Sequence, residues 1–265
     1  MIFHSSVEPL YYLLPLIGLI IGLFATALGG GGGFFFLPVL TLVLDVPAQT
    51  AVITSLVAAL PIGIVGIIGH HKKGNVNYRV GLWFSVFGII GAFLGAYITS
   101  KINPNQLKEY FGIYSIVLAV GIVYSTLRGT PVKSSDSRNR LDQFIRNMKS
   151  AFFGLCGGTI SGSFGTSGTG PVLAGLLSMR IPLKLVVGTS LMIVSINSVS
   201  AIGAHILVGQ IDLTLIEFLT AGSIVGSIIG PRIISKAQLD NKENSARYLY
   251  ALVLIVIGLL MIIKQ

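Results

Sequence analysis

Charged residues are scarce in this chain of 265 residues, because Asp, Glu, Lys and Arg make up only 10% of it. A soluble domain carries about 25%. A single cysteine, Cys156, excludes an intrachain disulfide. No metal-ligand spacing such as His-Glu-x-x-His occurs. The sequence therefore predicts no metal site and no cofactor, and its composition is unlike that of a soluble protein.

Hydrophobic residues take the place of the missing charges and make up 53% of the chain. Runs of 18 or more apolar residues are long enough to cross a bilayer. The 18 Lys and Arg residues lie between these runs, where they set topology, so nucleic acid is not an expected partner. An all-α integral membrane protein embedded in the lipid bilayer is predicted. Its eight apolar stretches cover residues 11–44, 48–69, 80–100, 107–127, 148–179, 183–208, 213–234 and 246–263.

The first and fifth stretches are too long for one span, and each is interrupted by glycine. Residues 29–33 are five consecutive glycines. Residues 165–170 read Gly-Thr-Ser-Gly-Thr-Gly and are followed by Pro171. Glycine and proline at this density interrupt a helix. Each stretch is predicted to form two shorter helices around non-helical backbone, as a re-entrant segment or a double crossing.

The two halves of the chain are repeats. A shift of 135 residues aligns residues 47–101 with 182–236 without gaps, and 14 of these 55 positions are identical, including Thr54-Ser55 with Thr189-Ser190 and His70 with His205. We expect a first transmembrane repeat over residues 1–127, a cytoplasmic linker over 128–147 and a second repeat over 148–265, each broken segment being followed by three transmembrane helices. Glycines spaced four apart are expected to allow close helix packing; they are Gly91, Gly95, Gly226 and Gly230.

Lys and Arg in the connecting segments predict the topology, because cytoplasmic loops retain them. If each broken stretch crossed once, the two sides would receive 10 and 8 basic residues, which is no bias. If each enters and leaves on the same side, or crosses twice, the counts become 15 and 3. We therefore expect a multi-pass protein of the cytoplasmic (cell) membrane with both termini extracytoplasmic. Each half then has an odd number of crossings, so the repeats are inverted, an architecture of secondary transporters.

The two breaks are the first candidate binding site. Non-helical backbone cannot face lipid, so it is buried in protein or lines a cavity. Free N–H groups and the positive dipole end at the start of a half-helix favour an anion. A small anionic substrate is therefore the expected partner. The candidate substrate-binding residues at the breaks are Gly30, Gly31, Gly32, Gly33, Ser163, Thr166, Ser167, Gly168 and Thr169.

Polar residues inside the predicted spans extend this site. The matched pairs Thr54-Ser55 and Thr189-Ser190 lie about six residues into their spans, which places them roughly 9 Å deep on opposite sides of the midplane. Asn197 lies near the centre of its span and is a further candidate. His70 and His205 fall at the membrane ends of matched spans and are candidates for a gating or proton role. No Asp or Glu lies in the middle of a span, so the coupling mechanism stays open.

Two other functions are alternatives. Gly165-Thr166-Ser167-Gly168 fits the Gly-x-Ser-Gly pattern of rhomboid-type intramembrane proteases, and His205 in a later span would be the base of a serine hydrolase. A four-residue match in a Gly- and Ser-rich segment is weak, so the sequence favours a transporter over an enzyme. A passive anion channel of the same fold and a homo-oligomer are compatible with the same features.

Several short motifs carry a family resemblance. The glycine run leading into Phe34-Phe35-Phe36-Leu37-Pro38, the pattern Pro47…Ala51…Thr54-Ser55-Leu56, the turn Gly74-Asn75-Val76 and the pair Gly91…Gly95 resemble the first repeat of the TauE/SafE sulfite exporter family. The resemblance implies export of sulfite, small organosulfonates or similar sulfur-containing anions across the cytoplasmic membrane. The chain departs from the family at residues 165–170, where hydroxyl residues replace a second glycine run.

Overall fold

The structure is a computed structural model that describes residues 2–28, 32–128, 140–179, 181–208, 211–234 and 243–264. Its elements are, in chain order, β1 (Ile2–Phe3), the 3-10 helix η1 (Pro9–Leu13), α1 (Leu14–Leu28), α2 (Gly33–Pro38), the π-helix η2 (Val39–Val43), α3 (Ala48–Lys72), α4 (Tyr78–Lys101), α5 (Pro104–Arg128), α6 (Arg140–Phe164), α7 (Thr169–Ser178), α8 (Leu183–Val208), β2 (Ile211–Asp212), α9 (Leu213–Ile234) and α10 (Glu243–Ile263).

The predicted class, a helical integral membrane protein, is confirmed. Among the described residues, five helices are long and apolar enough to cross a bilayer: Ala48–Lys72, Tyr78–Lys101, Pro104–Leu127, Lys184–Leu207 and Leu213–Gly230. Four shorter apolar helical segments accompany them over Pro9–Ala25, Gly33–Val43, Thr169–Ser178 and Arg247–Ile263.

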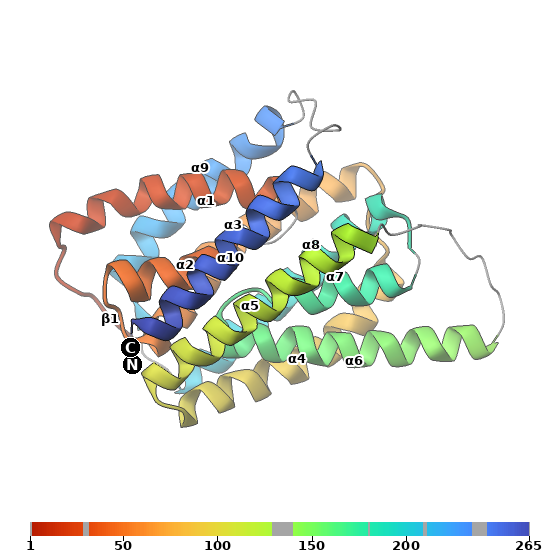
Figure 1. Ribbon diagram of the computed structural model, residues 1–265, viewed down its shortest axis with the longest axis horizontal. Helices are drawn as coiled ribbons and strands as arrows, with labels where there is room; N and C mark the ends of the chain where they lie inside the picture. The colour runs from red at the N-terminus through yellow and green to blue at the C-terminus, as the bar shows by residue number, and fades with distance from the viewer. Residues whose placement is uncertain are drawn as a thin grey trace.

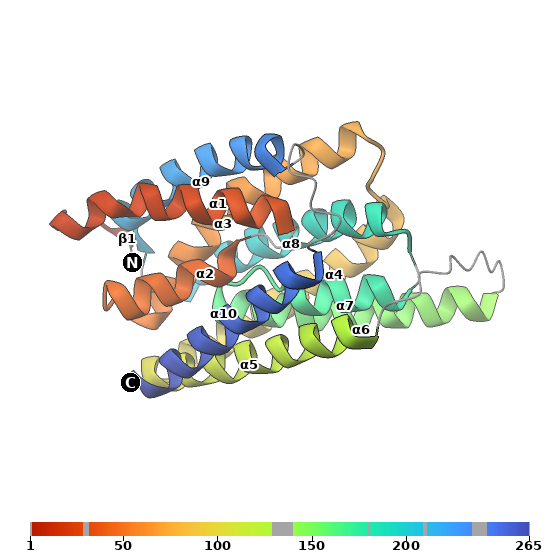
Figure 2. The same ribbon diagram turned by 45° about the horizontal axis from the view of Figure 1, so that its top comes forward.

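Both predicted helix breaks are present. The first separates α1 from α2, and the second separates α6 from α7. In Figures 1 and 2, α2 runs back toward the end of the bundle at which α1 begins, and α7 runs back along α6 in the same way. The two hairpins open at opposite ends of the bundle. Each broken segment therefore enters and leaves at one end and does not cross the bundle twice.

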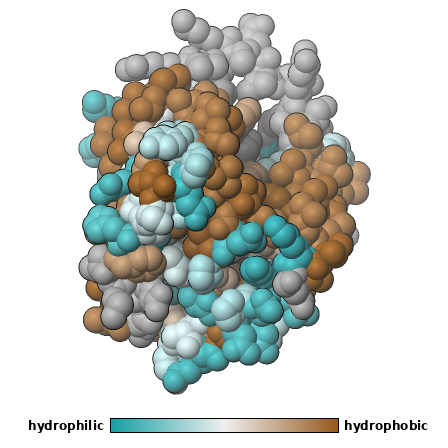
Figure 3. All heavy atoms as spheres, turned by 90° about the vertical axis from the view of Figure 1, so that its left-hand side faces the viewer, coloured by the Kyte–Doolittle hydropathy of each residue, from teal (hydrophilic) through white to brown (hydrophobic). Residues whose placement is uncertain are grey.

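The two ends of the bundle differ in which termini and connections lie there. Both termini lie at one end, together with the connections α4–α5 and α8–α9 (Figure 1). The connections α3–α4 and α7–α8 and the start of α6 lie at the other. Figure 3 looks on to the end with the termini, where hydrophilic residues gather across the lower face and apolar residues cover much of the rest.

Glycine allows the closest helix contacts. The most extensive packing joins α4 to α6 and, in the matching place of the other half, α9 to α1. A side chain on Gly91 or Gly95 would overlap backbone carbonyls of α6, and one on Gly226 would overlap the Leu19 carbonyl of α1. The expectation that these three glycines serve packing is confirmed, because helix backbones approach this closely only where no Cβ intervenes.

Within the part of the chain that the structure describes, a two-stranded pairing at the end with the termini departs from the all-helical prediction. β1 pairs in parallel with β2, with Ile2 opposite Ile211. The buried carboxylate of Asp212 accepts hydrogen bonds from the backbone N–H groups of Thr214 (3.0 Å) and Ser5 (3.3 Å). A carboxylate at the start of a helix satisfies free N–H groups, so Asp212 both caps α9 and attaches the N-terminal segment to the α8–α9 connection.

We predict that Gly158→Ala destabilises the protein, because the new Cβ would overlap the carbonyl oxygen of Gly88 across the α4–α6 contact. Overpacking of this kind costs about 1–3 kcal/mol. The matched control is Gly121→Ala in α5, where no atom lies within 4 Å of the added carbon. Thermal unfolding of the purified variants measures both changes. A melting temperature of Gly158→Ala equal to that of Gly121→Ala would contradict the packing.

Candidate functional site

The structure brings the two helix breaks into contact. A methyl group on Gly33 would lie 2.6 Å from the carbonyl oxygen of Gly165 and 3.0 Å from Oγ of Ser167. Gly33 is the first residue of α2, and Gly165 and Ser167 belong to the loop between α6 and α7. Only a residue without a side chain permits this approach, so the start of α2 is held against the second break by its backbone.

The second break has an unusual backbone. Gly165, Ser167 and Gly168 have φ angles of +68°, +64° and +62°, in the left-handed region. Such angles are uncommon for serine, and they cluster where surrounding structure enforces them, as at binding sites. A Cβ on Gly165 would also overlap the carbonyl oxygen of Val52 in α3. The loop is therefore tightly enclosed, and its last residue, Gly168, is the N-cap of α7.

Buried polar groups without partners gather at this break. The hydroxyls of Ser161 and Ser167 and both amide atoms of Asn197 have no hydrogen-bond partner within the described residues. These three residues are 0%, 1% and 0% exposed. The Thr166 hydroxyl faces the phenol of Tyr114 without reaching hydrogen-bond geometry. Each unpaired group costs about 1–3 kcal/mol, so their concentration here indicates a place where a polar ligand or water supplies the missing bonds.

Asn197 reaches the break from α8. Its side chain lies against the bare Cα of Gly88 on one side. A methyl group on Gly157 would lie 3.8 Å from Nδ2 of Asn197 and 3.2 Å from the carbonyl oxygen of Gly168. The matching residue in the other half is Ile62, whose Cδ1 would lie 2.7 Å from a methyl group on Gly32. The same position thus faces a break in each half, with an amide in one half and an alkyl group in the other.

The end of α6 is held by side chains of other helices. The last carbonyls of a helix lack intrahelical partners. Here Nε2–H of His205 donates to the Gly162 carbonyl (2.6 Å), and the Thr99 hydroxyl donates to the Ser163 carbonyl (2.9 Å). The Ser163 hydroxyl itself donates to the Gly95 carbonyl at 3.3 Å. His205 is only 2% exposed. The carbonyl that it binds belongs to Gly162, three residues before the loop, so His205 supports the second break structurally.

The matched hydroxyl pairs are buried but mostly bonded. Thr54 donates to the carbonyl of Thr50 (2.9 Å), Ser55 to that of Ala51 (2.7 Å) and Ser190 to that of Val187 (2.8 Å). Bonds of this kind to the preceding turn are common in helices. Thr189 differs, because its Oγ1 accepts from the backbone N–H of Asn77 at 2.9 Å and so ties α8 to the start of α4.

The remaining candidate residues lie partly at the breaks and partly away from them. Gly30 and Gly31 lie outside the described residues. Gly32 is the N-cap of α2 with φ +68°, and Thr169 is the first residue of α7. His70 lies in the last turn of α3, away from the breaks, and its Nδ1 has no hydrogen-bond partner within the described residues.

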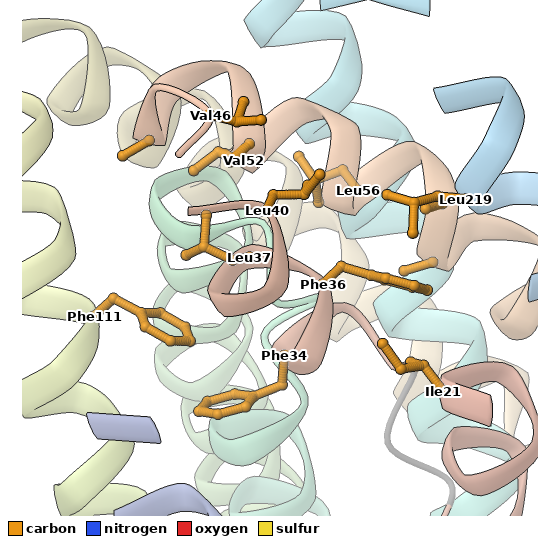
Figure 4. Close-up of a cluster of buried hydrophobic side chains, with 14 of the residues drawn as sticks. Ile21, Phe34, Phe36, Leu37, Leu40, Val46, Val52, Leu56, Phe111 and Leu219 are labelled. Carbon is orange, nitrogen blue, oxygen red and sulfur yellow. The ribbon is translucent and has the colours of Figure 1, made fainter. Parts of the chain in front are cut away.

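The structure also places an aromatic cluster at the breaks, and the sequence did not predict it. Phe34, which follows the first break, lies 4.9 Å from Phe111 of α5 between ring centroids, and Figure 4 shows the two rings side by side. Tyr114, one turn further along α5, stacks on Phe164 at 5.6 Å. Tyr114 within a predicted span is the sequence signal that could have indicated this contribution.

The hydrolase arrangement is not formed among the described residues. Oγ of Ser167 has no hydrogen-bond partner, and Nε2 of His205 is bonded to the Gly162 carbonyl. A serine nucleophile requires a base within hydrogen-bond reach. The described residues also contain no group of three or more side chains able to hold a metal ion.

We predict that Asn197→Leu leaves the melting temperature unchanged or raises it, and weakens binding of the predicted oxyanions. Leucine has a similar branched shape, and replacing an unpaired buried polar group by an apolar one removes its desolvation cost. Ile62→Leu, at the matching position of the other half, is the control and should retain binding. Thermal unfolding with and without added anion measures both effects. Loss of stability with unchanged binding would show that Asn197 is a structural residue.

Comparison with known proteins places the chain in a family. The model of the family described as sulfite exporter TauE/SafE matches residues 14–261. The probable membrane transporter protein YdhB of Bacillus subtilis is 26% identical over 235 residues, covering 86% of this chain and 94% of that protein. The probable membrane transporter protein MJ0441 of Methanocaldococcus jannaschii is 27% identical over 270 residues, covering 95% of each.

A probable membrane transporter protein of Xylella fastidiosa (strain 9a5c) is 28% identical over 233 residues, covering 86% of each chain. No solved structure matches significantly. The family model spans both halves of the chain and both helix breaks. The chain therefore belongs to the sulfite exporter TauE/SafE family of membrane transporters.

Proposed function

We propose that this protein transports a small sulfur-containing oxyanion, sulfite or an organosulfonate, out of the cytoplasm, and that the anion binds between the two helix breaks. The observation that carries the proposal is the contact between the breaks, at Gly33 and Ser167, among buried polar groups that have no hydrogen-bond partner in the described parts of the chain. The family model and the names of the relatives support transport as the activity.

The electrostatics favour a negative ligand. Each helix N-terminus carries an effective charge of about +0.5, and both α7 and the helical segment Gly33–Val43 begin at the breaks. Among the buried residues described, Asp212 is the only carboxylate, and it lies in β2. Two helix ends roughly balance a single anion without a buried Lys or Arg, which would hold the anion more tightly and slow its release.

Burial of the site favours a transporter over a channel. Ser161, Ser163, Thr166 and Ser167 are all 7% exposed or less, so the second break is buried in this conformation. A transporter exposes such a site alternately to each side, whereas a conducting channel needs a continuous path.

We further propose that the two halves, residues 1–127 and 148–265, are inverted repeats joined by a cytoplasmic linker. Helix packing supports this division, because α4 with α6 corresponds to α9 with α1, and α3 with α9 corresponds to α8 with α4. The 15 basic residues on one side of the proposed topology, against three on the other, support placing the linker in the cytoplasm and both termini outside.

The orientation predicts the labelling of an introduced cysteine. In a Cys156→Ser background, Ser135→Cys in the linker should react with a membrane-impermeant thiol reagent only after the cells are opened. Lys264→Cys at the other end should react in intact cells. Labelling of Ser135→Cys in intact cells would overturn the proposed orientation.

The anion site predicts selective stabilisation. Ligands that bind the folded state raise its melting temperature in proportion to RT ln(1 + [L]/Kd). We expect sulfite or a small organosulfonate, and no cation, to stabilise the purified protein. Ser167→Ala should weaken that effect, by about 1 kcal/mol or more in binding free energy, while Ser125→Ala at an exposed position of α5 should not. Stabilisation by a cation instead would reject the anion site.

A further inference from the structure

Four aromatic side chains cover the two breaks. Phe34 follows the first break, Phe164 precedes the second, and Phe111 and Tyr114 come from α5. Phe164 lies 5.7 Å from Phe111 and 5.6 Å from Tyr114, and Phe34 lies 4.9 Å and 6.2 Å from the same two rings. These contacts place α5 across both breaks, although α5 belongs to neither of them. The hydroxyl of Tyr114 is the only polar side-chain atom in this aromatic cluster.

The Tyr114 hydroxyl is directed at the start of α7. A methyl group on Gly170, the second residue of α7, would lie 3.1 Å from that oxygen. The hydroxyl also faces the Thr166 side chain in the loop. Helix α10 packs on α5, and the ring of Tyr250 in α10 lies 5.8 Å from Phe35, the residue after Phe34.

We propose that Tyr114 is a further substrate-binding residue, whose hydroxyl donates a hydrogen bond to the oxyanion held at the start of α7. This inference rests on the proposed function and identifies one of its ligand groups. It has support independent of the helix N-terminus, because the buried hydroxyl of Ser167, next to Thr166, has no partner within the described residues. A ligand that met Ser167 and the first N–H groups of α7 would lie next to the Tyr114 oxygen.

A phenol suits an anion that must be released. Its O–H is a neutral donor, so it contributes a directed hydrogen bond without a fixed positive charge. Hydrogen bonds to a charged acceptor are roughly twice as strong as those between neutral groups. The surrounding aromatic rings exclude water, which strengthens the bond to the anion. Tyr114 thus adds specificity for an oxygen acceptor on a side of the site that aromatic rings line.

The matching half has no equivalent. The residue 135 positions beyond Tyr114 is Leu249, and Tyr250 follows it. Asn197 and Ser167 likewise correspond to Ile62 and Gly32. Polar side chains are therefore concentrated on the second break, and we infer that the oxygen atoms of the substrate are bound there.

The test compares Tyr114→Phe with Tyr110→Phe. Both substitutions remove one hydroxyl from α5, but Tyr110 lies one turn earlier and is 46% exposed. Binding of sulfite and of methanesulfonate is measured on the purified full-length chain by thermal shift and calorimetry. We expect Tyr114→Phe to weaken binding of the preferred anion about tenfold or more, with an unchanged melting temperature in the absence of anion. Tyr110→Phe should bind as the wild type does.

Three outcomes would reject the inference in distinguishable ways. If Tyr114→Phe binds as the wild type does while Ser167→Ala binds weakly, the proposed anion site stands and Tyr114 serves packing alone. If both tyrosine variants weaken binding equally, the effect does not come from the hydroxyl at the breaks. If neither probe binds the wild type, the proposed function fails together with this inference.

Discussion

The need to bury non-helical backbone determines the arrangement of this protein. The start of α2 at Gly33 and the loop around Ser167 lie inside a structure whose sides face lipid, where unpaired N–H and C=O groups are costly. The protein meets this need by placing these two segments against each other and by using side chains of other helices as partners. His205 and Thr99 donate hydrogen bonds to carbonyls at the end of α6. The Val52 carbonyl of α3 packs directly against Gly165. A break supported in this way tolerates a few buried side-chain groups that have no hydrogen-bond partner within the described residues. These groups mark the candidate site.

Helix packing fixes the positions of the breaks. The glycine contacts join α4 to α6 and α9 to α1, so each broken helix is attached to a long helix of the other half. A movement of one half against the other would therefore carry a break with it and change the distance between Gly33 and Ser167. This coupling arises because each broken helix packs on a long helix of the other half, α1 on α9 and α6 on α4. In the proposed transport cycle, it would give a physical route by which opening at either end alters the candidate site.

Much of the fold could be predicted from the sequence, and much of the site could not. The apolar stretches and the glycine runs indicate helices and breaks directly, because both effects are local. Hydrogen-bond partners depend on tertiary contacts, so the sequence did not predict which candidate side chains are already bonded within the protein. Ser55 and Thr54 are bonded within α3, Thr189 holds the start of α4, and His205 supports α6. Tyr114 and the strand pairing of β1 with β2 require the three-dimensional arrangement of distant segments, which no periodicity reveals.

The two connections at opposite ends of the bundle differ in a way that bears on function. Asn77 caps α4 through Val80 and binds Thr189 through its N–H, whereas Asp212, at the matching position, caps α9 and binds the N-terminal segment. The connection before α9 therefore has an additional covering strand, β1, that the connection before α4 lacks. If the proposed transport involves opening at each end in turn, opening at the end with the termini breaks this pairing as well as separating helices. The two ends would then differ in opening cost.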